Sequence, residues 1–223
     1  MDARELSDLR REYAAGGLDE ADLEADPISM FRRWMHHAVR AGIYEPNALV
    51  LATASPDGTP SARIVLLKGL DERGFVFFTN YASRKGRDLE SNPRCALLFP
   101  WHSLERQVRV EGTATPLSAP ENDAYFASRP RAAQIGAWAS PQSEVIEDRS
   151  SLDARYAELV TSFGEREVPR PEHWGGYCVE PETVEFWQGR LGRMHDRLRY
   201  RRVTTGSTDG GGGGAWLTER LAP

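Results

Sequence analysis

Near its C-terminal end the chain reads Val184-Glu185-Phe186-Trp187-Gln188-Gly189-Arg190-Leu191-Gly192-Arg193-Met194-His195-Asp196-Arg197. Apolar and aromatic residues come first, two glycines follow, and Arg193, His195 and Arg197 then occupy alternate positions. Because alternate residues of an extended strand share one face, we expect these three side chains to point the same way. Two permanent cations beside a titratable imidazole suit an anionic or electron-rich ligand. A solvated edge strand would carry similar basic residues, so both interpretations stay open for this stretch alone.

The composition is that of an ordinary globular protein. The 223 residues are 40% hydrophobic and 27% charged, which is enough for one substantial core. The chain has 33 acidic and 28 basic side chains, and the resulting net charge of −5 argues against a general nucleic-acid binder. Two cysteines are too few for a disulfide framework. No apolar leader or membrane-length apolar run is visible, so we expect a cytoplasmic protein with neither nucleic acid nor membrane as partner.

The N-terminal part predicts two helices. Residues 1–26 are charged with one narrow apolar stripe, which predicts a short helix ending at Gly16-Gly17 that docks on the body or stays mobile. Asp26-Pro27 has the residue types of an N-cap and a first helical position, and core-type spacing follows as far as Gly42. That helix carries His36-His37, which cannot easily face one metal ion, so we expect no metal site.

From residue 47 the pattern changes to short apolar runs separated by polar turns. The predicted strands lie at 48–53, 63–68, 75–80, 94–99, 106–112 and 174–179 and in the stretch quoted above. Short turns favour antiparallel pairing, and about seven such strands favour a mainly β fold closed into a small barrel. Further helices are predicted from 83, from 118 to 129 and from 151 to 163, whereas 134–138 is predicted to be a loop and 204–214 a glycine-rich hairpin loop.

Basic side chains also stand where a phosphate would stabilise them. The helix beginning at Ser83 carries Arg84 and Lys85 in its first turn, where cations oppose the helix dipole unless an anion binds there. Tyr125 and Arg129 lie one turn apart on another predicted helix and would suit a phosphate clamp. Taken alone, such a pair is more often a surface feature.

A series of short motifs runs in order from about residue 9 to the terminal Arg220-Leu221-Ala222-Pro223. The motifs are Leu9-Arg10-Arg11-Glu12-Tyr13, Arg63-Ile64-Val65-Leu66-Leu67-Lys68, Thr79-Asn80, Ser83-Arg84-Lys85, Phe99-Pro100-Trp101, Glu105-Arg106-Gln107, Tyr125-Phe126, Ser128-Arg129-Pro130-Arg131, Gln134-Ile135-Gly136-Ala137-Trp138, Phe186-Trp187-Gln188-Gly189 and Arg193-Met194-His195-Asp196-Arg197. With so many motifs in register, the sequence resembles the pyridoxamine 5′-phosphate oxidase family, FMN enzymes that make pyridoxal 5′-phosphate. The resemblance implies an FMN-binding split β-barrel that forms a homodimer, with FMN in the clefts between subunits.

The resemblance also implies the site residues. Its flavin site would consist of Arg63, Ile64, Val65, Leu66, Leu67, Lys68, Phe78, Thr79, Arg84, Lys85, Gln107, Gln142, Ser143, Trp187 and Arg197. Its substrate site would consist of Arg10, Tyr13, Lys68, Tyr125, Arg129, Arg193 and His195, the last two being catalytic and lying over the pyridine ring. Arg10 and Tyr13 would belong to a mobile N-terminal lid over 1–26, followed by a single domain over 27–223.

The implied reaction is the final step of vitamin B6 cofactor synthesis and salvage. A hydride would pass from the 4′ carbon of pyridoxamine or pyridoxine 5′-phosphate to FMN, and O2 would reoxidise the flavin to give H2O2, with ammonia released from the amine. Four features depart from the family pattern, and one of them is the spacer Arg190-Leu191-Gly192. Ala133 stands where the family usually has a serine, which removes a contact of about 1 kcal/mol and predicts weaker substrate affinity. Phe78 stands where tyrosine is frequent, and the segment 204–214 is an insertion.

Two other function classes stay open at the level of sequence. A related split-barrel protein would bind flavin or another cofactor as a reductase or carrier, but the complete substrate set argues against it. An arginine-rich nucleic-acid module is a different class, and the acidic total and the lack of an aromatic stacking platform argue against that.

Overall fold

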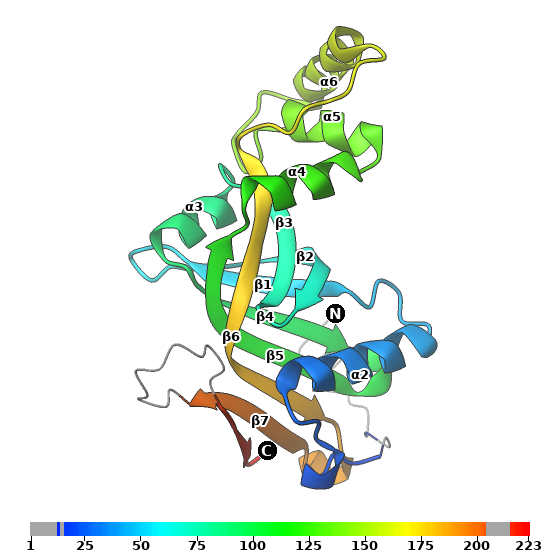
Figure 1. Ribbon diagram of the computed structural model, residues 1–223, viewed down its shortest axis with the longest axis vertical. Coiled ribbons are helices and arrows are strands. Elements are labelled where there is room, and N and C mark those ends of the chain that lie inside the picture. The colour runs from blue at the N-terminus through cyan, green and yellow to red at the C-terminus, as the bar shows by residue number, and fades with distance from the viewer. Residues whose placement is uncertain (1–12, 14–15, 204–214) are drawn as a thin grey trace, which may run out of the picture. The chain divides into compact units, whose positions relative to one another are not determined.

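The computed structural model describes residue 13, residues 16–203 and residues 215–223, and it is mainly β, as predicted (Figure 1). Its strands are β1 (Ala48–Ala54), β2 (Pro60–Asp71), β3 (Gly74–Asn80), β4 (Arg94–Trp101), β5 (Arg106–Pro116), β6 (Trp174–Gln188), β7 (Asp196–Val203) and β8 (Ala215–Arg220). Its α-helices are α2 (Pro27–Arg40), α3 (Arg84–Ser91), α4 (Ala119–Ala127), α5 (Arg131–Ala139) and α6 (Arg149–Phe163). Short 3-10 turns lie at Glu20–Asp22, His102–Leu104 and Leu191–Arg193.

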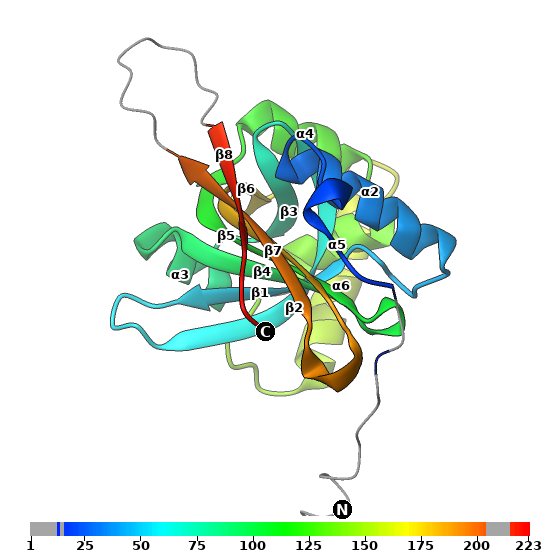
Figure 2. The same cartoon turned by 90° about the horizontal axis from the view of Figure 1, so that it is seen from below.

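The strands form one hydrogen-bonded sheet in the order β3-β2-β1-β4-β5-β6-β7-β8. A further pairing of β3 with β6 closes the first six strands on themselves, which confirms the predicted barrel and leaves no free edge among them. β7 and β8 continue beyond β6 and lie side by side as an antiparallel pair (Figure 2). Val203 pairs with Ala215, so the predicted hairpin is confirmed, while its connection 204–214 lies outside the described residues.

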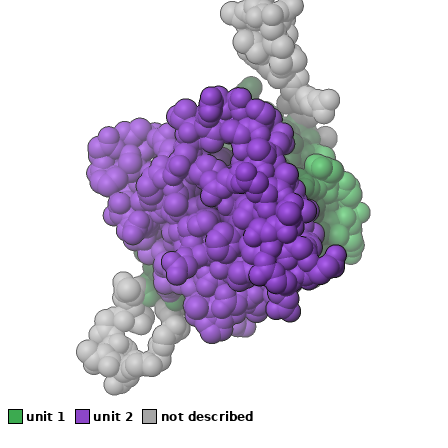
Figure 3. Space-filling view, turned by 90° about the horizontal axis from the view of Figure 1, so that it is seen from above, with its two compact units in different colours: residues 1–49, 97–111, 181–223 green, residues 50–96, 112–180 purple. Residues whose placement is uncertain are grey.

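The chain divides into two compact units (Figure 3). Unit 1 comprises residues 1–49, 97–111 and 181–223, and unit 2 comprises residues 50–96 and 112–180. Strands β1, β4, β5 and β6 each contribute residues to both units. The helix expected before Gly16-Gly17, and with it much of the lid expected over 1–26, lies outside the described residues, so the lid stays a prediction.

The core of unit 1 is built on α2. Its N-cap, Asp26, accepts hydrogen bonds from the backbone N–H groups of the second and third helical residues, as the sequence predicted. The buried face of the helix carries Phe31 and Trp34, whose rings meet Phe99 and Phe186 edge-on at centroid distances of 4.7 and 5.1 Å. Each such aromatic side chain contributes about 1.5–3 kcal/mol through burial, and the edge-to-face geometry adds to that.

The core of unit 2 gathers around Trp174, the first residue of β6. Buried Phe126, Ile135 and Val168 pack with it, and they come from α4, from α5 and from the segment after α6. Ser118 is the N-cap of α4 and forms a capping box with Glu121. This cluster holds the helices against β3 and thereby shapes the wall of the candidate site.

The run 134–138 is helical, so its prediction as a loop was wrong. It forms the middle of α5, where Ile135 is buried and Trp138 packs against Phe163 of α6 with ring centroids 5.9 Å apart. A Cβ at Gly136 would meet nothing within 4 Å, so no close contact requires a glycine there, and it is tolerated as a helical residue. Tertiary packing of the apolar face outweighs the weak local preference.

Residues 184–197 do not form a continuous strand. β6 extends through Gln188, but Leu191–Arg193 forms a 3-10 turn, and β7 begins only at Asp196. Gly192 and Arg193 both have φ of +61°, a conformation that glycine adopts readily and arginine rarely. The prediction that Arg193, His195 and Arg197 share one strand face was therefore wrong, because the turn at Gly192 breaks the alternation.

Candidate active site

Unit 2 contains a cavity of about 720 Å³ between the strands β2 and β3 and the segments that carry α3, α4 and α5. The predicted site residues that line it are Arg63, Ile64, Val65, Leu66, Lys68, Phe78, Thr79, Lys85, Tyr125, Arg129 and Gln142. Ala133 lines it as well. The predicted residues Leu67, Arg84 and Ser143 belong to unit 2 but are not among its lining residues.

One end of the cavity is built around the Lys85 ammonium. Lys85 is only 8% exposed, and its Nζ donates to Oε1 of Gln142 at 2.8 Å and to Oγ of Ser83 at 3.2 Å. The Thr79 hydroxyl donates to the same Gln142 oxygen at 3.4 Å. Burial, with a smaller contribution from the positive charge of Arg63, lowers the pKa of Lys85 to about 8. A buried ammonium whose partners are neutral oxygens would be stabilised by an anion.

Arg63 adds a second cation to this end. Its guanidinium donates to Oγ1 of Thr53 at 2.8 Å, to the carbonyl of Leu51 at 3.2 Å and to Oγ of Ser61 at 2.6 Å. The carboxylate of Asp88 lies 3.9 Å away and accepts a hydrogen bond from Thr53 at 2.7 Å. Burial lowers the pKa of Arg63, and Asp88 partly offsets that effect. The strand β1 therefore holds this guanidinium at the cavity in a fixed position.

The other end of the cavity is aromatic and carries Arg129. The rings of Phe78 and Tyr125 stack with centroids 3.8 Å apart, and Tyr125 and Trp174 are parallel at 6.2 Å. The Arg129 guanidinium carbon lies 4.5 Å from the centre of the Trp174 ring, a cation–π contact. In the described part of the chain, Nη1 of Arg129 is the one buried side-chain nitrogen or oxygen without a hydrogen-bond partner. A buried donor without an acceptor costs free energy that an anionic ligand would recover.

Trp174 was missed by the sequence analysis as a site residue. It lines the cavity and carries the Arg129 contact, yet the two residues are far apart in the sequence. The Trp174-Gly175-Gly176 run indicated only the start of a strand. The predicted helix over 118–129 ends at Ala127, so Arg129 lies in the turn between α4 and α5. No spacing rule links an aromatic residue at a strand start to an arginine in a distant turn, so only the fold could reveal this contact.

Unit 1 brings together three predicted residues, Tyr13, Trp187 and His195. The ring centroids of Trp187 and His195 lie 4.6 Å apart, and Tyr13 contacts both rings edge-on at 5.8 and 5.5 Å. A Cβ at Gly189 would come within 2.8 Å of the Tyr13 ring, so glycine is needed for this close approach. Nδ1 of His195 accepts a hydrogen bond from the Arg190 N–H at 3.1 Å.

The remaining predicted residues of unit 1 differ in their surroundings. Arg193 is exposed on its turn. Arg197 donates from Nε and Nη2 to buried Glu185 at 2.7 and 3.2 Å, and this carboxylate raises the pKa of the arginine. Glu185 also binds Arg109 at 2.9 Å. Gln107 lies half-buried on β5, and the predicted residue Arg10 is outside the described part of the chain.

Within the described part of the chain, no helix combines the length and apolarity required to cross a membrane. The same residues contain no group of three or more histidine, cysteine, aspartate or glutamate side chains arranged to hold a metal ion.

Comparison with known families identifies the fold. A family model described as pyridoxamine 5′-phosphate oxidase matches residues 35–162. The chain belongs to the pyridoxamine 5′-phosphate oxidase family. A second model, described as the pyridoxine 5′-phosphate oxidase C-terminal dimerisation region, matches residues 174–223. The family predicted from the order of the motifs is thus confirmed.

Curated relatives match almost the whole chain. A pyridoxine/pyridoxamine 5′-phosphate oxidase from a Nocardioides species is 61% identical over 219 residues, covering 98% of both chains. One from Rubrobacter xylanophilus is 60% identical over 220 residues, covering 99% of this chain and 97% of the relative.

Solved structures show the same fold. PhzG from Burkholderia lata, solved with tetrahydrophenazine-1-carboxylic acid, has a TM-score of 0.85 and 35% identity, covering 94% of this chain and 99% of its own. A pyridoxamine 5′-phosphate oxidase-related, FMN-binding protein from Nostoc punctiforme has a TM-score of 0.67 and 19% identity, covering 90% of this chain and all of its own, and supports the fold alone.

Proposed function

We propose that the protein oxidises pyridoxamine 5′-phosphate and pyridoxine 5′-phosphate to pyridoxal 5′-phosphate, with FMN as cofactor. The acceptor is O2, which becomes H2O2, and the amine substrate additionally consumes water and releases ammonia. The observation that carries this proposal is the unpaired, buried Nη1 of Arg129 in a cavity with further cations at its other end. The cofactor and the substrate each carry a phosphate, and this cavity offers cationic donors for both phosphates.

The residues around Lys85 fit the FMN phosphate. The ammonium is buried and its partners are neutral, so a phosphate would return it to a fully charged state. Arg63 and the other residues of β2 would line the flavin, with Phe78 and Thr79 beside it. The bound cofactor would supply the redox chemistry, namely acceptance of the hydride and reoxidation by O2. The protein itself contributes orientation and electrostatics.

The aromatic end fits the phosphate of the substrate. Arg129 would donate to it through Nη1, while its guanidinium plane stays against Trp174. Lys68 and the Tyr125 hydroxyl would contribute the other donors. Ala133 lines the same wall without a hydroxyl, so this site offers one donor fewer than the usual family pattern.

We assign the unit 1 residues Arg193 and His195 to the pyridine ring and the reacting 4′ carbon, as the family resemblance implies. Arg10 and Tyr13 would close over the substrate, and Gln107, Trp187 and Arg197 would complete the flavin shell. The dimerisation region matched by residues 174–223 supports a homodimer, and we place one FMN in each cleft between subunits. Both free cysteines are buried thiols, in keeping with a reducing cytoplasm as the working compartment.

The test is turnover with matched substrates. Protein loaded with FMN should form pyridoxal 5′-phosphate and H2O2 from either phosphorylated vitamer, and unphosphorylated pyridoxamine should react far more slowly because Arg129 then has no anion. A reduced phenazine carboxylic acid is the second substrate to assay, because the PhzG structure contains a ligand of that class. Flavin-loaded protein that releases peroxide with neither phosphorylated vitamer would refute the proposal.

A further inference from the structure

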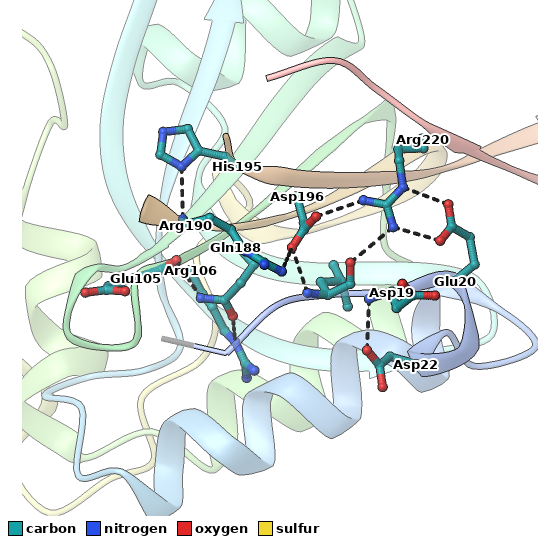
Figure 4. Close-up of polar contacts among 11 residues, drawn as sticks. Asp19, Glu20, Asp22, Glu105, Arg106, Gln188, Arg190, His195, Asp196 and Arg220 are labelled. Carbon is teal, nitrogen blue, oxygen red and sulfur yellow. Dashed lines mark hydrogen bonds and ion pairs between the residues drawn. The ribbon is translucent and has the colours of Figure 1, made fainter. Parts of the chain in front are cut away.

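The carboxylate of Asp196, the residue after His195, joins three separate segments of unit 1 (Figure 4). Its Oδ2 accepts hydrogen bonds from the Leu18 N–H at 3.0 Å and from Nη1 of Arg190 at 3.1 Å. Its Oδ1 accepts from Nη1 of Arg220 at 2.8 Å. Asp196 is thereby held from the N-terminal segment, from the turn before β7 and from β8.

Arg220 is itself fixed, so it is a firm support for Asp196. Its Nε and Nη2 donate to the two carboxylate oxygens of Glu20 at 2.8 and 2.7 Å, and Nη2 also reaches the Leu18 carbonyl at 3.3 Å. The hydrogen bond from Arg220 lowers the pKa of Glu20 to about 2, so both partners stay charged over the working pH range.

The network reaches His195 through Arg190. The side chain of Arg190 binds Asp196, and its backbone N–H donates to Nδ1 of His195. A neutral imidazole that accepts at Nδ1 carries its proton on Nε2, so this contact selects the tautomer. The ring is further confined by Trp187 and Tyr13.

The position of Gly17 shows how closely the N-terminal segment approaches this network. A Cβ there would lie 2.0 Å from Nη1 of Arg190 and 3.1 Å from Oδ2 of Asp196. A glycine at residue 17 is therefore required for Arg190 to reach Asp196 in the observed position.

We propose that Asp196 is a positioning residue for the oxidation, which keeps Arg190 in place so that His195 presents its Nε2–H to the substrate. The inference rests on the proposed function for the role of His195 in turnover. The control of the His195 tautomer by Asp196 does not depend on which reaction the protein catalyses. Asp196 itself touches neither the reacting atoms nor the cofactor in this assignment.

The experiment replaces Asp196 by asparagine. Asparagine can offer its oxygen to one side only, and its amide NH2 then meets the donors of Arg220 or those of Arg190 and Leu18. In protein labelled with 15N-histidine, NMR should show Nε2 protonated in the wild type and a mixture of tautomers in Asp196→Asn. With pyridoxamine 5′-phosphate, kcat should fall about tenfold while KM changes little, because the phosphate contacts are intact.

Two further variants keep the test decisive. Glu219→Gln breaks the ion pairs with Arg199 and Arg201 in the same hairpin without touching Asp196, so tautomer and kcat should match the wild type. Gly17→Ala displaces the guanidinium of Arg190 and crowds Oδ2 of Asp196 at 3.1 Å while the carboxylate itself is kept, so it should repeat the effect of Asp196→Asn even if that variant folds poorly.

The inference is overturned if Asp196→Asn and Gly17→Ala both keep the wild-type tautomer and kcat, or if Glu219→Gln reproduces their effect. Failure of the proposed function gives a different result, in which the wild type does not oxidise the vitamers while the tautomer still responds to Asp196→Asn.

Discussion

Lys85 should make FMN affinity depend on pH in a defined direction. In the protein without ligand, burial holds the pKa of this ammonium at about 8, well below the ordinary value of 10.5. A phosphate beside it favours the charged form, so binding should raise the pKa again. If the pKa of a group rises on ligand binding, its contribution to affinity is complete at pH values below its pKa in the free protein. That contribution is lost as the pH rises from there towards the pKa of the group in the complex.

The size of the pH effect on FMN affinity follows from the pKa of Lys85 in the protein without FMN. Between pH 7 and pH 9 the protonated fraction of a group titrating near 8 falls about tenfold, so the dissociation constant of FMN should rise by about the same factor, or about 1.4 kcal/mol. The phosphate of FMN stays doubly charged over this range, since its second pKa lies near 6, and contributes little of the change.

The assay is titration of the apoprotein with FMN, followed by quenching of flavin fluorescence at pH 7, 8 and 9. Lys85→Met should bind FMN more weakly and should lose the pH dependence. The matched control is Arg87→Gln on the same helix, which removes an exposed cation that does not line the cavity. A wild-type dissociation constant that is flat over this range, together with unchanged affinity in Lys85→Met, would refute the assignment of Lys85 to the phosphate.

Three further predictions concern neighbouring contacts. Arg129→Gln should raise KM for pyridoxamine 5′-phosphate by one to two orders of magnitude, because it removes a charge-assisted contact of about 1.5–3 kcal/mol, and FMN content should not change. The control is Arg131→Gln, whose guanidinium binds only surface carbonyls among the described residues; its steady-state kinetics should match the wild type. Ala133→Ser should lower KM about fivefold by adding one neutral hydrogen bond of about 1 kcal/mol, and an unchanged KM would show that this wall does not reach the substrate. Glu185→Gln removes the buried carboxylate that Arg197 and Arg109 share, and denaturant unfolding should show a loss of about 1.5–3 kcal/mol, since both guanidinium groups keep access to solvent; an unchanged stability would contradict that role.

Much of the local structure was predictable from short segments. Asp26-Pro27 and Ser118 mark helix starts because capping depends on residues within one turn, and both helices begin there. The strands were predictable because their apolar runs are bounded by turn residues. The family followed from many short motifs in the same order, and this evidence does not depend on knowing any contact.

Other features depended on contacts between segments that lie far apart in sequence. The helix α5 forms over a run that was predicted as a loop because Ile135 and Trp138 find apolar partners in unit 2. Trp174 joins the cavity because β6 carries it against Arg129 in the distant turn after α4.

The sequence by itself determined the family, the mainly β fold and the set of candidate residues, because residue types, caps and motif order are local properties. Only the tertiary structure decided which candidates share a cavity, which cations already have a carboxylate and which donor is left unpaired. Arg197 and Arg129 look alike as sequence positions, yet one is neutralised by buried Glu185 and the other has a buried nitrogen with no acceptor. That difference arises from burial and from the partners that folding brings near, and no pattern in the chain encodes it locally.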